Sequence, residues 1–358
     1  MKNKEMEGRE MKKWTMWMGI YAVFVCLLLI TTGQAYAAKE FITVSTATTG
    51  GSTFVKYSAL ANVWNQYISE IKATAVPSSG CAENNYLWGE KKSDAGHACP
   101  GVFSDAYYGK KIHYTGKKID FMTHMFNAGS TNLHMCVIEG KFPNIKSPAD
   151  FKGMKVGAGP PGGLPYIWLT DVTKAYGVGM NEMTLRTGPS GQLAKMLVDG
   201  NIDVLTAGHG IPASTFMSLG SSHKLRFIDI APNMMEKIVK DHPYYWGNAV
   251  KAGQTPYFTH PVTLLAETMF FAIKNDVSED VVYRMMKSMW KERKTLEAAH
   301  KEWKATLDQE EGMFWPRSAP LHPGAVKFYK ELGFTDKELE TGKITPEKKG
   351  TIKNKVLN

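Results

Sequence analysis

The stretch Phe41-Ile42-Thr43-Val44-Ser45, followed by Thr48-Thr49-Gly50-Gly51-Ser52-Thr53, decides the fold. Its first five residues are rich in β-branched side chains and predict a strand. Beyond the glycines, apolar residues recur at helical spacing, namely Phe54, Tyr57, Leu60, Ala61 and Trp64. The sequence therefore predicts a strand, a glycine turn and a helix, which is the repeating unit of an α/β sheet.

This glycine turn is also a candidate anion site. The first turn of a helix has unpaired N–H groups and lies at the positive end of the helix dipole. Gly51 has no Cβ to obstruct a ligand. The Ser52 and Thr53 hydroxyls can either cap the helix or contact the ligand. We expect a carboxylate there, while an ordinary capped turn that binds nothing stays open on this stretch alone.

Residues 1–37 are typical of a secretory signal peptide. Lys12-Lys13 precede an almost continuously apolar run from Met16 to Thr32, and Gln34-Ala35-Tyr36-Ala37 supplies a small–x–small cleavage pattern. We expect cleavage after Ala37, with Met11 as an alternative start and an uncleaved membrane anchor as the alternative interpretation. The mature chain is then expected to be soluble and periplasmic.

The bulk composition excludes little but favours two domains. The chain has 358 residues, 43% hydrophobic and 22% charged, with a formal net charge of +9. This length suits two cores. The positive charge is spread along the chain without a dense Arg/Lys block, so we expect no nucleic-acid partner.

Export makes disulfide formation possible. Cys81 and Cys99 bracket a polar segment that resembles an insertion, and a disulfide between them would stabilise the fold by about 3 kcal/mol. Free, partly buried thiols are the alternative. Cys136 lies in an apolar run and is expected in the core.

Alternating strand and helix patterns continue along the mature chain and predict mainly parallel sheets. The expected strands are 71–76, 119–126, 132–139, 154–158, 183–186, 202–207 and 225–230, and the expected helices begin near 81, 148, 164 and 192. Residues 88–118 are expected to form a long loop with some helix, and Asn127–Ser130 to cross between domains. The last third is expected to be mainly helical, with Ser278 as a helix cap and a buried stripe made of Val282, Met285, Met286, Met289, Leu296 and Trp303.

One motif suggests an enzyme. Gly157-x-Gly159-x-x-Gly162 matches a dinucleotide-binding pattern, yet Pro160 and Pro161 remove backbone donors where a pyrophosphate needs them. An exported nucleotide-dependent enzyme is therefore kept as the alternative function. No other catalytic motif is present, and the ten histidines lack metal-ligand spacing on any expected helix. We expect no catalytic residue, no cofactor and no metal, because repeated strand-to-helix turns without a nucleophile–base pair favour binding over catalysis.

Several motifs together resemble the TAXI family, the TRAP-associated extracytoplasmic immunogenic proteins that serve as solute receptors of TRAP transporters. The similar segments are Thr49–Phe54, Gly80–Asn84, Ala149–Val156, Pro161–Gly163, Asp199–Asp203, Gly210 with Pro212, Leu321–Ala325 and Tyr329–Gly333. Their order extends the resemblance over roughly residues 42–333. Cys81 and Gly163 replace serines of the family pattern, which removes two hydroxyls that could hold a carboxylate.

The resemblance implies a two-lobed, type II periplasmic-binding-protein-like fold with a ligand cleft between the lobes. It implies a first lobe of residues 38–130 and 236–334, a second lobe of residues 131–235, and a polar mobile tail of residues 335–358. The ligand would be a small organic anion, such as an amino acid or dicarboxylate, and the partners would be TRAP membrane permease subunits. We expect a monomer, and a sensor subunit with the same fold is a further alternative. The expected ligand-binding residues are Gly51, Ser52, Thr53, Phe54, Asn84, Pro161, Gly162, Gly163, Gly208, His209 and Tyr257.

Overall fold

The structure, a computed structural model, describes residues 39–49, 52–308, 313–315 and 317–345, with single residues at 14, 17, 18, 348 and 351. The chain divides into two compact units, Met1–Glu40 and Phe41–Asn358, and the fold below is that of the second unit. The predicted cleavage after Ala37, the alternative start at Met11 and the glycine Gly51 lie outside the described residues. Within the described residues, no helix is both long and apolar enough to span a bilayer.

The stretch quoted at the outset forms the predicted strand and helix. Strand β1 (Glu40–Ser45) precedes α2 (Ser52–Tyr67), and β2 (Ile71–Val76) follows. The inward face of α2 buries Tyr57, Leu60 and Trp64, because residues three and four apart share one side of a helix.

The segment predicted as a long loop with some helix, residues 88–118, contains the expected helix and also a strand that was not predicted. Helix α3 (Cys81–Gly89) is followed by β3 (Ala95–Ala98) and α4 (Pro100–Tyr108). Strand β3 lies between β1 and β10 in the sheet. Its sequence, Ala-Gly-His-Ala, has no β-branched residue, and a Cβ at Gly96 would collide with the Ser45 carbonyl oxygen. Close packing therefore requires a glycine at position 96, and glycine is not typical of a strand.

Two long strands form the centre of the sheet. Strand β4 (Met122–Ile138) and strand β10 (Val262–Lys274) pair antiparallel from Leu265 opposite Leu133 to Lys274 opposite Met122. The expected strands 119–126 and 132–139 are thus one strand, and Asn127–Ser130 continues it. Strand β10 was not predicted, which corrects the expectation of a mainly helical last third.

The remaining elements flank this pair. They are η1 (Pro148–Phe151), β5 (Lys155–Ala158), α5 (Leu164–Ala175), η2 (Met180–Glu182), β6 (Thr184–Thr187), α6 (Ser190–Val198), β7 (Val204–His209), α7 (Ser214–Ser222), β8 (Leu225–Phe227), α8 (Pro232–Asp241) and β9 (Tyr245–Val250). The strand order is β2-β1-β3-β10-β4-β7-β5-β6, with β8 on β4 and β9 on β10.

The predicted α/β class is confirmed, but the sheet is mixed, not mainly parallel. Strands β1 and β3, β5 and β6, and β5 and β7 pair parallel. Strands β4 and β10 are antiparallel to each other. The pairings of β10 with β3 and β9, and of β4 with β7 and β8, are antiparallel as well. The two long strands run through both halves of the sheet, so the predicted separate lobe sheets are joined into one.

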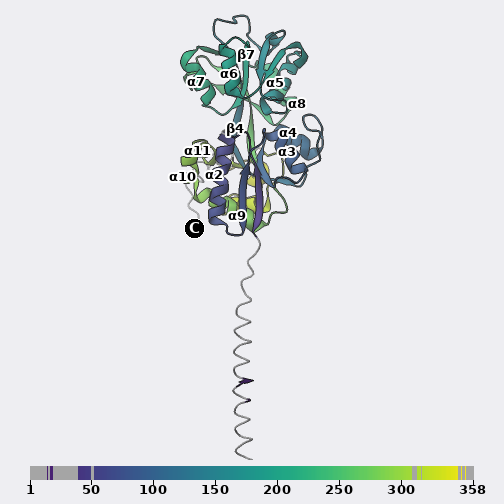
Figure 1. The fold of residues 1–358 in the computed structure, drawn as a ribbon, viewed down its shortest axis with the longest axis vertical. Coiled ribbons are helices and arrows are strands. Elements are labelled where there is room, and N and C mark those ends of the chain that lie inside the picture. Colours follow the sequence, from purple (N-terminus) through teal and green to yellow (C-terminus); the bar gives the residue numbers. More distant parts are fainter. Residues whose placement is uncertain are drawn as a thin grey trace, which may run out of the picture. The chain divides into compact units, whose positions relative to one another are not determined.

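Two groups of helices surround different halves of the sheet. Figure 1 shows α2, α9, α10 and α11 around one half and α5, α6, α7 and α8 around the other, with β4 passing between them. This is the two-lobed, periplasmic-binding-protein-like arrangement. Along the chain, α8 and β9 contact each other, and β10 pairs with β9 up to Glu267 before it pairs with β3 from Phe270.

The C-terminal helices complete the first lobe. They are α9 (Glu279–Lys291), α10 (Arg293–Ala299), α11 (Glu302–Leu307), α12 (Pro323–Glu331) and α13 (Asp336–Thr341). The Ser278 hydroxyl caps α9 by accepting from the Val281 N–H, and the predicted methionine-rich stripe is buried, as expected. The first part of the segment expected as a polar tail forms α13, which Thr335 caps and in which Leu339 is buried.

Candidate functional site

The first turn of α2 contains the two hydroxyl groups predicted to contact a ligand, and solvent can reach them. Ser52 is exposed, and Thr53 and Phe54 are half-buried. Gly51, the residue before them, lies outside the described residues. The start of α2 therefore remains a candidate site for an anion at the positive end of the helix dipole.

Lys56, four residues beyond Ser52, is the residue of this region that the sequence reasoning missed. Its side chain is buried, and Nζ donates to the Ala128 carbonyl at 3.0 Å and to the Thr306 hydroxyl at 3.3 Å. Glu302 Oε2 lies 3.6 Å from the ammonium group. Burial lowers the pKa of Lys56, and the Glu302 carboxylate opposes that change. A signal was present, since Lys56 falls within the buried helical stripe that includes Leu60.

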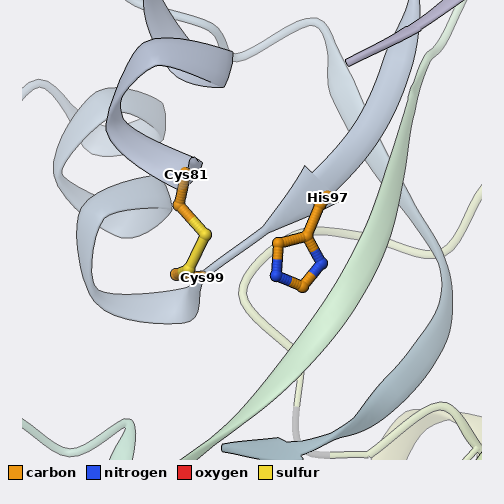
Figure 2. Close-up of side chains that lie close together, drawn as sticks. All are labelled: Cys81, His97 and Cys99. Carbon is orange, nitrogen blue, oxygen red and sulfur yellow. A yellow bond between two sulfur atoms is a disulfide. The ribbon is translucent and has the colours of Figure 1, made fainter. Parts of the chain in front are cut away.

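Figure 2 shows the predicted disulfide beside His97. Cys81 and Cys99 are joined with a Cα–Cα distance of 5.6 Å, so the start of α3 is tied to the start of α4. The two sulfur atoms and a ring nitrogen of His97 lie within 4.8 Å of one another. Because both sulfurs share the disulfide bond, neither is a thiolate ligand. Burial, and then the Lys56 charge, lower the pKa of His97 to about 3, which leaves its ring neutral. The Tyr57 hydroxyl lies 3.1 Å from Nδ1 of that ring.

Asn84 has a structural role where we predicted a ligand contact. It is buried, and its Nδ2 donates to the Thr46 carbonyl at 2.9 Å and to the His97 carbonyl at 2.8 Å. Its Oδ1 accepts from the Ser78 hydroxyl at 2.7 Å. The amide thus holds the ends of β1 and β3 against α3, and both of its donors are used within the protein.

The second predicted turn, Pro160–Gly163, packs against the first lobe. The Gly163 N–H donates to the Pro160 carbonyl at 2.8 Å, which closes a tight turn at the start of α5. Pro161 and Gly162 are exposed. A Cβ added to Gly162 would lie 3.8 Å from Cβ of Ala82, in the first turn of α3. This turn therefore faces α3.

His209 ends β7 and lies among polar and aromatic partners. Its Nε2 is 3.1 Å from the Ser190 hydroxyl, and its ring packs edge-on against Phe216. Burial lowers the pKa of His209, so the ring is neutral at pH 7, although the Glu302 carboxylate opposes that shift. A Cβ added to Gly210 would lie 3.8 Å from Oε1 of Glu302. Glu302 thus stands between the β7 end and Lys56 on α2.

Two further predicted residues turn out to serve packing. Tyr257 is buried among Phe216, Phe227 and Phe258, and its hydroxyl accepts from the Ala213 N–H at 3.0 Å. It cannot close a pocket from there, which corrects that prediction. Gly208 lets α5 approach β7, because an added Cβ would meet Pro165 at 3.2 Å.

The dinucleotide alternative loses its structural basis. Gly157 lies within β5, where a Cβ would meet Ile202 at 2.5 Å, and Gly159 packs against Pro165. Both glycines thus have a packing role that explains them without a phosphate.

Comparison with known proteins identifies the family. Residues 44–333 match the model of the NMT1-like family. The chain belongs to this family. The match spans nearly the same residues as the resemblance described above. It shows the NMT1-like family and does not show TAXI membership in particular.

Several solved structures are similar in shape. One, described as the structure of a periplasmic transporter, is 17% identical with a TM-score of 0.49, covering 86% of this chain and 96% of that one. The periplasmic aliphatic sulphonate binding protein SsuA from Escherichia coli is 12% identical with a TM-score of 0.44, covering 82% and 84%. The alkanesulfonate-binding protein SsuA from Xanthomonas axonopodis pv. citri, bound to MOPS, is 14% identical with a TM-score of 0.44, covering 81% and 83%. At these identities and scores the similarities assign no ligand to this chain.

Proposed function

We propose that this protein is a periplasmic solute-binding receptor that captures a small organic anion between its lobes and delivers it to membrane transport subunits. The observation that carries the proposal is the position of Glu302. Its carboxylate lies 3.6 Å from Lys56 Nζ on α2 and, through Oε1, beside Gly210 at the end of β7. The start of α2 and the end of β7, from different lobes, therefore face one polar region.

The charges around this region favour an anion. The start of α2 supplies unpaired N–H groups and the positive end of a helix dipole. The Ser52 hydroxyl is exposed there, and the Lys56 ammonium group lies one turn further along the same helix. Gly51, Thr53, Phe54, His209 and the Pro161–Gly163 turn remain proposed ligand neighbours. The carboxylate of Glu302 makes a ligand with a second, cationic group, such as an amino acid, a good fit.

We further propose that the chain is exported by cleavage after Ala37 and that its partner is a TRAP-type permease. The support is the order of the TAXI-like motifs between residues 49 and 333 and the leader pattern of residues 1–37. The receptor is expected to act as a monomer and without a catalytic residue or cofactor for its transport role.

The first experiment identifies the ligand. Native mass spectrometry of the untreated protein should show a bound small molecule, and a thermal-shift screen should rank carboxylates, amino acids and sulfonates. A ligand at about 100 times its dissociation constant adds roughly 2.7 kcal/mol to the free energy of unfolding, which a melting experiment resolves. A stoichiometric adenine nucleotide in the spectrum would instead support the enzyme alternative.

A charge substitution tests the site. Ser52→Asp adds a negative charge at the start of α2, where it repels an anionic ligand but suits the helix dipole. We expect affinity for the identified anion to fall at least tenfold with an unchanged melting temperature. Ser69→Asp adds the same charge beyond the other end of α2, at an exposed position, and should bind like the wild type. Equal affinity of the two variants would contradict the proposed site.

Uptake measurements identify the partner. In cells that express the receptor with its neighbouring permease genes, TRAP-type uptake should cease when the ion gradient is dissipated while ATP is maintained. Uptake that follows ATP and not the gradient would indicate an ABC-type partner. Ligand binding without any uptake would indicate a sensor subunit.

A further inference from the structure

Three potential metal ligands meet away from the region described above. His113 Nε2 lies 3.5 Å from Asp171 Oδ1, and His242 Nε2 lies 3.7 Å from the same oxygen. The three ligand atoms all lie within 4.8 Å of one another. We call this set the His–Asp–His cluster.

The cluster joins segments that are distant in the sequence. His113 follows α4, and its backbone N–H donates to Asp105 Oδ2 at 2.7 Å. Asp171 lies in α5, and His242 directly follows α8. Because α4 belongs to the first proposed lobe while α5 and α8 belong to the second, a ligand bound here would join the two lobes. Spacing along the sequence cannot reveal such a set.

Neighbouring side chains orient the ligand atoms. The Tyr245 hydroxyl donates to Asp171 Oδ2 at 2.8 Å, which leaves Oδ1 directed at the histidines. The Tyr244 hydroxyl lies 3.0 Å from His242 Nδ1 and leaves Nε2 available. Partners of this kind, on the far side of each ligand, are characteristic of metal sites, where they fix the ring and the carboxylate.

One ligand atom is buried and faces the carboxylate. His113 Nε2 makes no hydrogen bond of good geometry within the part of the chain that the structure describes, and its charged neighbour is Asp171 Oδ1 at 3.5 Å. This nitrogen can hold a proton that pairs with the carboxylate, or, in its neutral form, coordinate a cation that the carboxylate also binds.

The spacing suits a tetrahedral ion. With bonds of about 2.1 Å, neighbouring ligands of a tetrahedral zinc site lie roughly 3.4 Å apart. The two nitrogen–oxygen distances, 3.5 Å and 3.7 Å, are close to that value. Imidazole and carboxylate ligands suit zinc and other first-row transition metals better than calcium, which prefers oxygen.

A route from solvent lies next to the cluster. A cavity of about 260 Å³ is lined by Ile112, Asp241 and Pro243, the chain neighbours of the two histidines, and by Asp105. Lys110 and Arg317 also line it, so its charges are mixed. The side chains of His113 and His242 are 11% and 17% exposed, so a small part of each ring is open to solvent.

We propose that His113, Asp171 and His242 bind one first-row transition-metal ion, with zinc as the preferred ion, and that the ion ties α4 and its following segment to α5 and α8. The site is separate from the proposed ligand region around Ser52 and Glu302, so the two proposals can fail independently.

Zinc titration tests the site. The purified protein is stripped with a chelator and titrated with zinc chloride by calorimetry. We expect one zinc per chain and a melting temperature that rises with the logarithm of the zinc concentration. His113→Gln and His242→Gln should each weaken binding at least tenfold, and Tyr245→Phe by roughly 10- to 100-fold. Cobalt substituted for zinc should give the visible absorption of a tetrahedral ion and lose it in the histidine variants.

The control is His223→Gln, which removes a histidine of α7's C-terminal cap and leaves the cluster intact. It should bind zinc like the wild type. The proposal is overturned if the stripped wild-type protein binds no zinc, or if the two cluster variants bind it as tightly as His223→Gln. Because Gln keeps the size and polarity of the side chain, circular dichroism should show that all variants are folded.

Discussion

The two sides of the β4–β10 pair contain buried ionisable groups of opposite type, a base on one side and acids on the other. On the side of α2 and α11, Lys56 is a buried cation whose ammonium group has a carbonyl, a hydroxyl and a carboxylate as partners. On the side of α4 and α5, Glu267 and Asp171 are buried acids, and Glu267 Oε1 has no hydrogen-bond partner among the described residues. Figure 1 shows these two sets of helices on either side of β4.

This difference shows that a buried ionisable group beside the central strands can stay charged or become neutral, depending on its partners. A buried charge is tolerated when it is paired, and it changes protonation when it is not. Lys56 is paired and connects α2 to β4, whereas Glu267 becomes protonated. We expect the cation side to respond to substitution and the acid side to respond to pH.

The largest effect is expected for Glu267. Burial raises the pKa of Glu267 to about 8, and the Asp171 carboxylate adds to the rise, while a hydrogen bond from the Gly101 N–H opposes it. The folded protein therefore holds a proton that the unfolded chain releases near its ordinary pKa of 4.5. Stability from this group is complete below the unfolded pKa and is lost as the pH rises through the folded pKa, by about 1.4 kcal/mol for each pH unit within that window.

Urea unfolding between pH 5 and pH 9 measures this loss. Glu267→Gln keeps a neutral side chain at every pH, so its free energy of unfolding should fall less steeply over this range than that of the wild type. Parallel curves for the two proteins would show that Glu267 titrates normally in the folded state.

The second largest effect is expected for the disulfide, which lies on the acid side. It joins the starts of α3 and α4, and α4 positions Gly101 beside Glu267. Replacing both partners, Cys81→Ser with Cys99→Ser, should lower the free energy of unfolding by about 3 kcal/mol. Denaturant unfolding under oxidising conditions checks this value, and the reduced wild type should behave like the double variant.

On the cation side, Lys56→Met keeps the apolar stem and removes the ammonium group. The Ala128 carbonyl and the Thr306 hydroxyl then lose a buried donor, so we expect a loss of about 1–3 kcal/mol in the free energy of unfolding. Lys72→Met, at an exposed position of β2, is the matched control and should change stability little. If both variants unfold alike, the interactions of Lys56 are not stabilising.

The smallest effect is expected for Tyr257, which lies outside both charged regions. Tyr257→Phe removes the hydroxyl that accepts from the Ala213 N–H and leaves the ring packing in place. The expected loss is about 1 kcal/mol, measured by thermal unfolding. Ligand affinity should stay the same. A drop in affinity would indicate that Tyr257 contacts the ligand after all.

Much of the fold could be predicted from local patterns. The β-branched residues of 41–45 and the helical stripe that follows them specify β1 and α2, and Ser278 marks the start of α9, because capping and periodicity are local properties. Strand β3 could not be predicted in this way. Its small residues were selected by contact with Ser45, a residue distant in the sequence.

The same division holds for the sites. The helix start at Ser52 and the disulfide between Cys81 and Cys99 could be predicted from the sequence, and a ligand contact of Ser52 and Thr53 stays a prediction. Asn84 and Tyr257 were misjudged, since only their hydrogen-bond partners reveal that they are internal.

The sequence by itself determined the α/β class, the strand and helix of residues 40–67, and the leader pattern, since each depends on neighbouring residues. Only the tertiary structure decided that β4 and β10 run through both lobes, that Lys56 is buried beside Glu302, and that His113, Asp171 and His242 meet. Those features depend on pairing and burial between distant segments. Such contacts form only when the segments pack together, and they produce no periodic pattern in the sequence.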